Sequence, residues 1–259
     1  MKVTERLKKS PLPFTTSTLQ QDASSKLNFA PQKTMRIAQQ LYEGVNIKGQ
    51  GTVGLITYLR TDSTRISVEA DAAAKEYIKE AYGAEFVGAG TVAKKDDKKV
   101  QDAHEAIRPT YMTNSPASIK DELSRDQFRL YQLIWNRFMA SRMAPAKYEN
   151  TSVKIAAGDY RFNASASKIA FDGFLSVYNI NNEKSEGNVM LKSIDEDTKL
   201  TLNDLEPKQH FTQPPAHYTE ESDVQVLTHQ RSQRSQQDVM LSKKRRTYTS
   251  QSLEKQSTT

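Results

Sequence analysis

The sequence contains no cysteine, and this absence excludes two kinds of site. Without cysteine the chain can form neither a disulfide framework nor a cysteine-ligated zinc centre. Histidine is also scarce, and its widely spaced positions show no metal-binding pattern: His104, His210, His217 and His229. The residues of this chain therefore predict no metal site of its own.

Long apolar runs are absent as well. No stretch approaches the ~20 residues that a membrane-spanning helix needs, and the N-terminus lacks the apolar core of a signal peptide. We therefore expect a cytoplasmic protein with no membrane partner. Its mean hydropathy of -0.72 is polar, and its net charge of +6 with a pI of about 9.2 suits a polyanionic partner.

Residues 223–259 lack glycine, proline, phenylalanine and tryptophan, and are rich in Ser, Gln, Thr, Lys and Arg. Such a segment cannot bury enough apolar surface to order itself, so we expect a disordered basic tail. From residue 229 onward it supplies +5 of the +6 charge, which leaves the rest of the chain close to neutral. Translation in a shifted frame, an unrelated tail and a nonspecific DNA-binding tail all remain open.

Helix signals fill the first part of the chain. Caps and apolar periodicity predict four helices that begin near Ser17, Pro31, Ser67 and Ser124. The glycine-rich stretch 44–54 is expected to be a loop, and the charge run 94–99 a surface loop. Aromatic residues of the fourth helix, Tyr131 and Trp135, are expected in the core; stacking on bases is the alternative.

Alternating patterns replace the helix signals after Pro145. Strand-like segments at 151–155, 160–166, 171–180 and 199–205 predict a small antiparallel sheet. The acidic cluster at 195–197 reads as part of a turn between strands.

The stretch 54–67, GLITYLRTDSTRIS, carries the clearest chemical signal. Its first half predicts a short buried strand that ends near Tyr58, and its second half is polar and rich in arginine. Residues two apart on a strand share a face, so Tyr58 and Arg60 could share one site. A phenol that attacks a phosphodiester needs such a cationic donor to stabilise the developing charge. The alternative is a half-buried strand tyrosine beside a surface arginine.

Five blocks, in order, resemble the type IA DNA topoisomerases. The stretch 54–67 resembles their active-site segment, in which Tyr-x-Arg-Thr-Asp-Ser carries the nucleophile. The block 101–110, QDAHEAIRPT, resembles their histidine-containing motif. Three further blocks agree, and together the five cover about 11–220: PFTTSTLQ at 13–20, LYQLIWNRF at 130–138 and HFTQPP at 210–215.

The resemblance implies that one DNA strand is broken and rejoined through a 5′-phosphotyrosine intermediate, which relaxes negative supercoils without ATP. In this reading Tyr58 is the nucleophile, Arg60 stabilises the transition state and His104 assists. A structural histidine is the alternative for His104. The partner is single-stranded DNA, held by weaker candidates: Thr61, Asp62, Ser63, Arg65, Arg108 and Gln20.

The resemblance also implies Mg²⁺, which these enzymes bind in an acidic Toprim domain. The sequence contains no such domain, so we expect a central fragment whose partners are the Toprim and remaining domains of a nucleoid-associated enzyme. The pattern of the family stops soon after residue 220, where a Gly-Arg-Pro-Ser-Thr motif is expected. This chain by itself is then expected to be inactive.

The predicted fold is multi-domain, with α and β parts. An entry segment spans 1–13, a mainly helical domain with the tyrosine and a short strand spans 14–146, an antiparallel β hinge domain spans 147–215, and a basic tail spans 216–259. Alternative functions are a noncatalytic single-stranded DNA-binding piece and a partly folded pseudogene product. A phage integrase-like enzyme is disfavoured, because Tyr58 precedes every histidine.

Overall fold

The computed structural model describes residues 2–89 and 104–178, and beyond them residues 199, 201, 204, 206, 209 and 211–214. Several expectations lie outside the described residues. These are the charge run at 94–99, most of the strand at 199–205, the acidic cluster at 195–197, the histidines at 210, 217 and 229, and the tail from 216.

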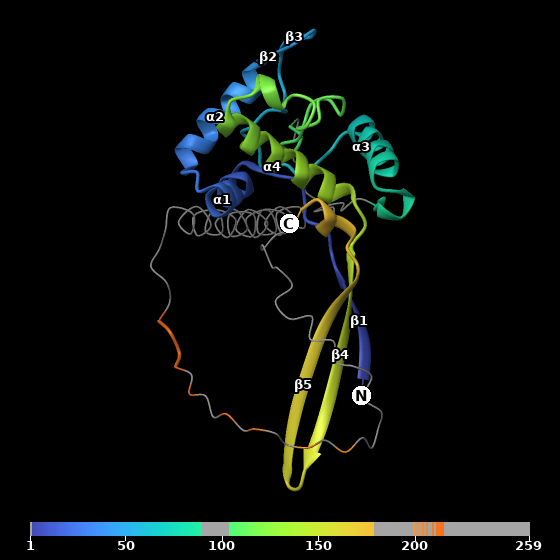
Figure 1. The fold of residues 1–259 in the computed structure, drawn as a ribbon. Helices are drawn as coiled ribbons and strands as arrows, with labels where there is room; N and C mark the ends of the chain where they lie inside the picture. The colour runs from blue at the N-terminus through green and yellow to red at the C-terminus, as the bar shows by residue number, and fades with distance from the viewer. Residues whose placement is uncertain are drawn as a thin grey trace, which may run out of the picture.

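The described chain consists of a helical body and a long β ribbon that extends from it (Figure 1). The body contains α1 (Thr16–Leu27), α2 (Pro31–Glu43), β2 (Val45–Ile47), β3 (Gly51–Val53), α3 (Val68–Ala81) and α4 (Arg125–Arg142). The ribbon contains β1 (Lys2–Lys8), β4 (Ala146–Ala157) and β5 (Tyr160–Phe171). Short 3-10 helices complete the list: η1 (Ala84–Phe86), η2 (Lys120–Glu122) and η3 (Gly173–Ser176). Helices mixed with antiparallel sheets are the class that the sequence predicts.

The central helix of the body is α4, which packs against α1, α2 and α3. It begins with the predicted capping box, in which Ser124 and Gln127 satisfy each other's backbone amides. Tyr131 and Trp135 are buried among other apolar side chains, so their prediction as core residues is confirmed. Among the described helices, none is long and apolar enough to cross a membrane.

Two of the other helix starts agree with the sequence, and one is displaced. Pro31 is the first residue of α2, and the Ser67 hydroxyl caps α3. The first helix, however, is capped by Thr15 and not by Ser17. Thr15 forms a capping box with Thr18, and the two side chains satisfy amide groups at the start of α1. The helix cap therefore lies two residues before the one that the sequence pattern indicates.

Residues 44–54 form a hairpin and not the predicted loop. Val45–Ile47 pairs antiparallel with Gly51–Val53, and Gln50 closes the turn by donating to the carbonyl of Ile47 at 2.9 Å. Gly49 and Gly51 have φ of 79° and 75°, a conformation that glycine adopts at little cost. The glycines that indicate a loop therefore serve the turn of a short hairpin.

The predicted strand into Tyr58 is reduced to a single bridge between Ile56 and Pro109. Leu55 and Ile56 are both buried, with 1% and 2% of their surface exposed. Consecutive buried residues do not alternate across a sheet, and the segment runs through the core between other elements. The apolar residues that predict a strand are here buried without one.

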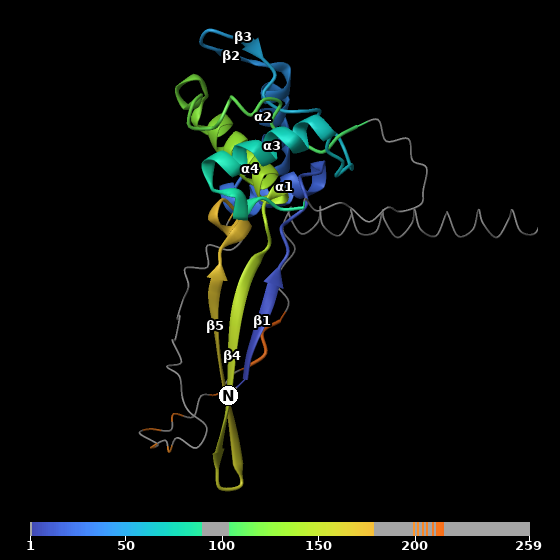
Figure 2. The same cartoon turned by 90° about the vertical axis from the view of Figure 1, so that its right-hand side faces the viewer.

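The ribbon is a three-stranded sheet in the order β1-β4-β5, with antiparallel neighbours (Figure 2). The strands expected at 151–155 and 160–166 are present as β4 and β5, which are longer than predicted and are joined by a turn at 158–159. Residues 1–13 are not simply an entry segment, because β1 pairs along β4 from Lys2 with Ser152 to Lys8 with Ala146. Pairing between segments that are 138 to 150 residues apart leaves no local signal in the sequence.

The predicted strand at 171–180 is replaced, from Gly173, by η3. Gly173 has φ of 50°, and a Cβ at this position would lie 2.5 Å from the carbonyl oxygen of Ala144. This tight turn brings Phe174 into the core with no exposed surface. The chain therefore returns from the ribbon to the body at the base of α4.

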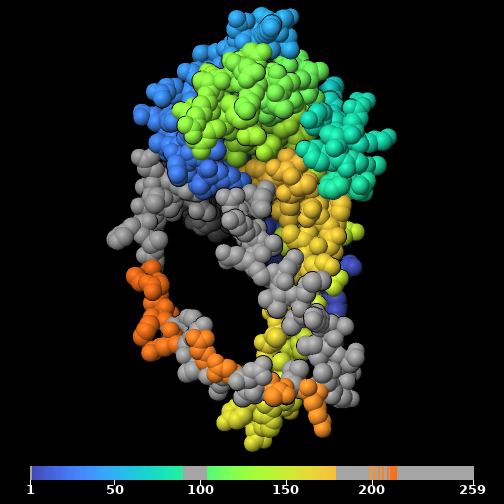
Figure 3. Space-filling model, viewed as in Figure 1, coloured from blue at the N-terminus to red at the C-terminus, as the bar shows by residue number. Residues whose placement is uncertain are grey.

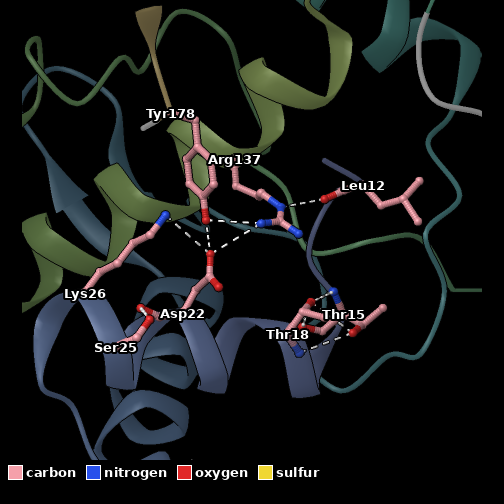
Figure 4. A network of polar contacts seen from close by, with 8 residues as sticks. All are labelled: Leu12, Thr15, Thr18, Asp22, Ser25, Lys26, Arg137 and Tyr178. Carbon is pink, nitrogen blue, oxygen red and sulfur yellow. Dashed lines mark hydrogen bonds and ion pairs between the residues drawn. The ribbon is translucent and has the colours of Figure 1, made fainter. Parts of the chain in front are cut away.

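A polar network fixes this return to α1 and α4 (Figure 4). The Arg137 guanidinium donates to the carbonyl of Leu12 at 2.6 Å and to the hydroxyl of Tyr178 at 3.2 Å, and pairs with Asp22 at 3.4 Å. Tyr178 donates to the Asp22 carboxylate, and Lys26 lies 3.4 Å from the centre of the Tyr178 ring. Burial lowers the pKa of both Arg137 and Lys26, and the Asp22 carboxylate opposes this effect.

Removal of the central guanidinium tests how far this network stabilises the body. We expect Arg137→Ala to lower the free energy of unfolding by about 3 kcal/mol, because Asp22 and the Leu12 carbonyl lose their partner in a mostly buried site. Urea denaturation of the chain measures this. Lys33→Ala is the control, since its ion pair with Asp126 lies at the surface, where water and salt screen it, and should contribute little to stability. Equal losses in the two variants would contradict a stabilising role for the network.

Candidate active site

Tyr58 lies on the connection between β3 and α3, where the chain crosses the body, and 39% of its surface is exposed. Both of its neighbours are held from inside. Leu59 is 1% exposed, and Thr57 is half-buried and hydrogen-bonded to residues of the histidine block. The phenol is therefore accessible on a backbone that has little freedom to move.

The histidine block holds the chain just before Tyr58. The hydroxyl of Thr57 donates to the carbonyl of Ala106 at 2.7 Å and accepts from the amide of Arg108 at 3.0 Å. The amide of Thr57 donates in turn to the carbonyl of Arg108 at 3.0 Å. One threonine thus satisfies three polar groups and ties the tyrosine segment to 104–110.

The start of α1 holds the chain just after Tyr58. The hydroxyl of Thr16 donates to the carbonyl of Leu59 at 2.7 Å and accepts from the amide of Thr61 at 2.9 Å. The amide of Thr16 donates to the carbonyl of Thr61 at 2.9 Å. In place of strand pairing, side-chain hydroxyls complete the hydrogen bonds of this segment.

Two aromatic rings contact the ring of Tyr58. His104 stacks on it, with ring centroids 5.4 Å apart and planes inclined by 30°. Tyr42, from the end of α2, meets it edge-on at 5.5 Å. His104 is itself exposed. The structure thus brings Tyr58 and His104, two of the predicted site residues, into contact.

Exposure alternates along the residues that follow the tyrosine. Tyr58, Arg60 and Asp62 are exposed, whereas Thr61 and Ser63 are 6% and 7% exposed. Tyr58 and Arg60 thus both reach solvent although no strand forms here. That the two side chains share one face stays a prediction.

Thr61 and Ser63, which the sequence offers as DNA contacts, point inward. The Thr61 hydroxyl accepts from the amide of Ser63 at 3.0 Å, and the Ser63 hydroxyl accepts from the amide of Arg65 at 3.2 Å. Both hydroxyls therefore shape the loop. Because these two residues are buried, Arg60 and Asp62 are the residues of this stretch that can contact a ligand at the surface.

The remaining candidates occupy different places. Arg108 is bound to Glu105, with nitrogen-to-oxygen distances of 2.8 and 2.7 Å, and it also donates to the carbonyl of Pro109. Arg65 is exposed, and its carbonyl accepts from the amide of Ala106 at 2.8 Å. Gln20 is half-buried on α1. Of these, Arg65 binds the histidine block through its backbone carbonyl, and Arg108 is engaged within its own block.

Among residues 2–89 and 104–178, no group of three or more His, Asp or Glu side chains is placed to hold a metal ion. The described site therefore offers hydroxyl, imidazole and guanidinium groups. These groups suit a reaction at a phosphate, in which an exposed phenol is the nucleophile and cationic donors face the developing charge.

A pocket of about 660 Å³ opens beside the tyrosine segment, between the β2–β3 hairpin and residues 110–113. Its lining includes Tyr42, Gln50, Thr57 and Tyr111. Sequence patterns do not indicate this pocket, because its walls come from three separate segments.

The structure adds Thr16, Thr57 and Tyr42 to the residues that matter for the site. Thr16 and Thr57 lie inside two of the blocks that carry the family resemblance, and this is the signal that could have identified them. Their partners are about 45 or more residues away in the sequence, so the role of each hydroxyl requires the fold. Tyr42 gives no local signal.

Loss of the Thr16 hydroxyl should loosen the segment on the far side of Tyr58. We expect Thr16→Ala to raise the hydrogen-exchange rate of the Thr61 amide by about fivefold, the effect of losing one hydrogen bond worth about 1 kcal/mol. Exchange measured by NMR or by mass spectrometry of the peptide around 58–62 reports this. Ser25→Ala, on an exposed part of α1, should leave the same amide unchanged. An unchanged rate in Thr16→Ala would contradict the anchoring role.

Comparison with known proteins agrees with this geometry. A family model described as DNA topoisomerase matches residues 1–231, which extends the likeness at both ends beyond 11–220. The structure of full-length topoisomerase I from Thermotoga maritima is similar, with 37% sequence identity and a TM-score of 0.67. The match covers 88% of this chain and 36% of that one, so the chain spans about a third of its length. The chain belongs to the DNA topoisomerase family, among the bacterial enzymes of type IA.

Proposed function

We propose that this chain carries the nucleophile with which a type IA topoisomerase cleaves one strand of DNA. The phenolic oxygen of Tyr58 attacks a backbone phosphorus and forms a 5′-phosphotyrosine bond. The phenol gives up its proton as it attacks, the bond between phosphorus and the 3′-oxygen breaks, and the leaving 3′-oxygen takes up a proton. After passage of another strand, the 3′-hydroxyl attacks the phosphotyrosine and restores the original bond, which relaxes negative supercoils.

One observation carries this proposal: Tyr58 exposes its phenol, while hydrogen bonds of Thr57 and Thr16 hold the backbone on either side of it. A nucleophile positioned in this way needs little rearrangement before it meets a bound phosphate. The segment is exposed only at alternate residues, so the strand would approach from the side of Tyr58 and Arg60.

The residues around Tyr58 have distinct proposed roles. Arg60 donates to the phosphate oxygens, on which charge increases in the transition state. His104 stacks on the Tyr58 ring and contacts the reacting phosphate or carries a proton. Asp62 is exposed near the same surface and orients arginine side chains of the loop.

Magnesium belongs to the proposal for the whole enzyme and not to the described part of this chain. The residues at 2–89 and 104–178 present no cluster that fits a metal ion, so no step here passes through one. The partners that we propose are single-stranded DNA and the domains that complete the enzyme. Cytoplasmic, nucleoid-associated action follows from that substrate.

Removal of the phenolic oxygen tests the nucleophile. The chain is mixed with a separately expressed Toprim segment, Mg²⁺ and a labelled single strand, and covalent adducts are counted on a denaturing gel. We expect an adduct with the original chain and only background with Tyr58→Phe, which keeps the ring that contacts His104 and Tyr42. Tyr160→Phe is the matched control, since it removes a hydroxyl from another exposed tyrosine, at the start of β5. An adduct that survives Tyr58→Phe would refute the assignment.

Removal of the Arg60 guanidinium tests whether this residue assists the reaction itself or only adds positive charge that attracts DNA. We expect Arg60→Ala to lower the rate of adduct formation by about 10²-fold to 10³-fold, as for loss of one donor to a developing oxyanion. Arg125→Ala, at the exposed start of α4, should change the rate little. The same rate loss in both variants would indicate a general charge effect.

Noncatalytic DNA binding by this chain alone is the second proposed function, since the chain spans about a third of its relative. We expect the purified chain to bind single-stranded DNA and to leave supercoiled plasmid unrelaxed in the presence of Mg²⁺. Agarose-gel assays with and without the Toprim segment measure this. Relaxation by the chain alone would contradict the expectation.

A further inference from the structure

The pocket between the β2–β3 hairpin and residues 110–113 adjoins the nucleophile directly. Thr57 lines it and immediately precedes Tyr58. Tyr42 also lines it, and the same ring meets the ring of Tyr58 at 5.5 Å. A group bound in the pocket would therefore lie next to a phosphate bound at Tyr58.

The chemistry of the lining differs from that of the tyrosine loop. Among the described residues that line the pocket, none carries a charge at neutral pH. Its polar groups are hydroxyls and one amide, contributed by residues such as Thr52, Thr113 and Gln50. A lining without cations is poorly suited to a phosphate and well suited to the hydrogen-bonding edge of a neutral heterocycle.

Two aromatic rings form part of the walls and are open to solvent. Tyr42 is 39% exposed and Tyr111 is 55% exposed. Exposed aromatic rings are the usual platforms on which unpaired bases stack. The volume of about 660 Å³ lies within the ~300–1,000 Å³ typical of pockets for small molecules, so it can hold a base with its sugar.

The pocket is held in shape before any ligand enters. Gln50, in the hairpin turn, and Asn114 exchange two hydrogen bonds between their amide groups, at 3.0 and 3.2 Å. Asn114 is 2% exposed, and its carbonyl accepts from the buried hydroxyl of Tyr131 at 2.7 Å. The hairpin, which extends beyond the end of α2 in Figure 2, is thus tied to α4. In Figure 3 it forms the end of the body opposite the ribbon.

We propose that this pocket binds one base of the DNA strand, next to the phosphate at Tyr58, with Tyr111 as a stacking platform. This inference rests on the proposed function and adds a base-binding subsite to it. Arg60 and His104 contact the phosphate, and the neutral pocket takes the adjoining base. One surface thus binds the phosphate of the nucleotide through charged groups, and the neighbouring pocket binds its base by stacking.

Comparison of a normal single strand with an abasic strand isolates the contact with the base. Oligothymidylate and an abasic backbone of equal length are titrated into the full chain, and binding is followed by fluorescence anisotropy. We expect Tyr111→Ala to weaken binding of oligothymidylate at least about fivefold, the lower end of the effect of one stacked base. Binding of the abasic strand should not change.

Two further variants complete the design. Tyr111→Phe keeps the ring and should bind both strands as the original chain does. Tyr160→Ala, which removes a tyrosine that is 74% exposed beside the turn between β4 and β5, should also leave both affinities unchanged. Because Tyr111 is exposed, its removal should leave the thermal unfolding midpoint in place, which circular dichroism checks.

The outcomes separate this inference from the function on which it rests. If Tyr111→Ala weakens both strands equally, the ring contacts the backbone and the inference is wrong. If it weakens neither strand while Arg60→Ala weakens both, the pocket binds no base and the proposed DNA site stands. If neither strand binds to the original chain, both proposals fail.

Discussion

Two threonine hydroxyls on either side of Tyr58 are the constraint on which the site depends. The tyrosine segment has only the bridge between Ile56 and Pro109 as strand pairing, so other hydrogen bonds must hold it. The Thr57 hydroxyl binds the carbonyl of Ala106 and the amide of Arg108 in the histidine block, and the Thr16 hydroxyl binds the carbonyl of Leu59 and the amide of Thr61. A side chain that satisfies several backbone groups at once fixes position more closely than apolar packing alone, because each bond has a direction.

The anchors depend in turn on the segment that leads into α1. Phe14 is fully buried, forms a bridge with Ile107 and lies under the Arg137 guanidinium at 4.9 Å. Arg137 also holds the carbonyl of Leu12, two residues before Phe14. The same short stretch therefore touches the histidine block, the tyrosine segment and the network around α4. A disturbance at Arg137 can reach Thr16 through this stretch, although no catalytic group is near the guanidinium in the sequence.

The surface near Tyr58 divides into two chemical regions. Arg60 and Asp62 are exposed just after Tyr58 in the sequence, whereas the pocket that Tyr42 lines is neutral and partly aromatic. A nucleotide has the same two parts, a charged phosphate and a neutral base that can stack. The hairpin that completes the pocket is therefore more than a connection between α2 and the tyrosine segment.

The sequence by itself determined those features that depend on near neighbours. Pro31 and Ser124 mark helix starts because caps and fixed backbone angles act within one turn, and the ordered motifs single out Tyr58, Arg60 and His104. The tertiary structure alone decided which distant groups meet. Pairing of β1 with β4, the stacking of His104 on Tyr58 and the inward turn of Thr61 all require residues separated by tens to about 150 positions. Local propensities do not predict such contacts, because the contacts stabilise the protein only after the long loops between their residues have closed.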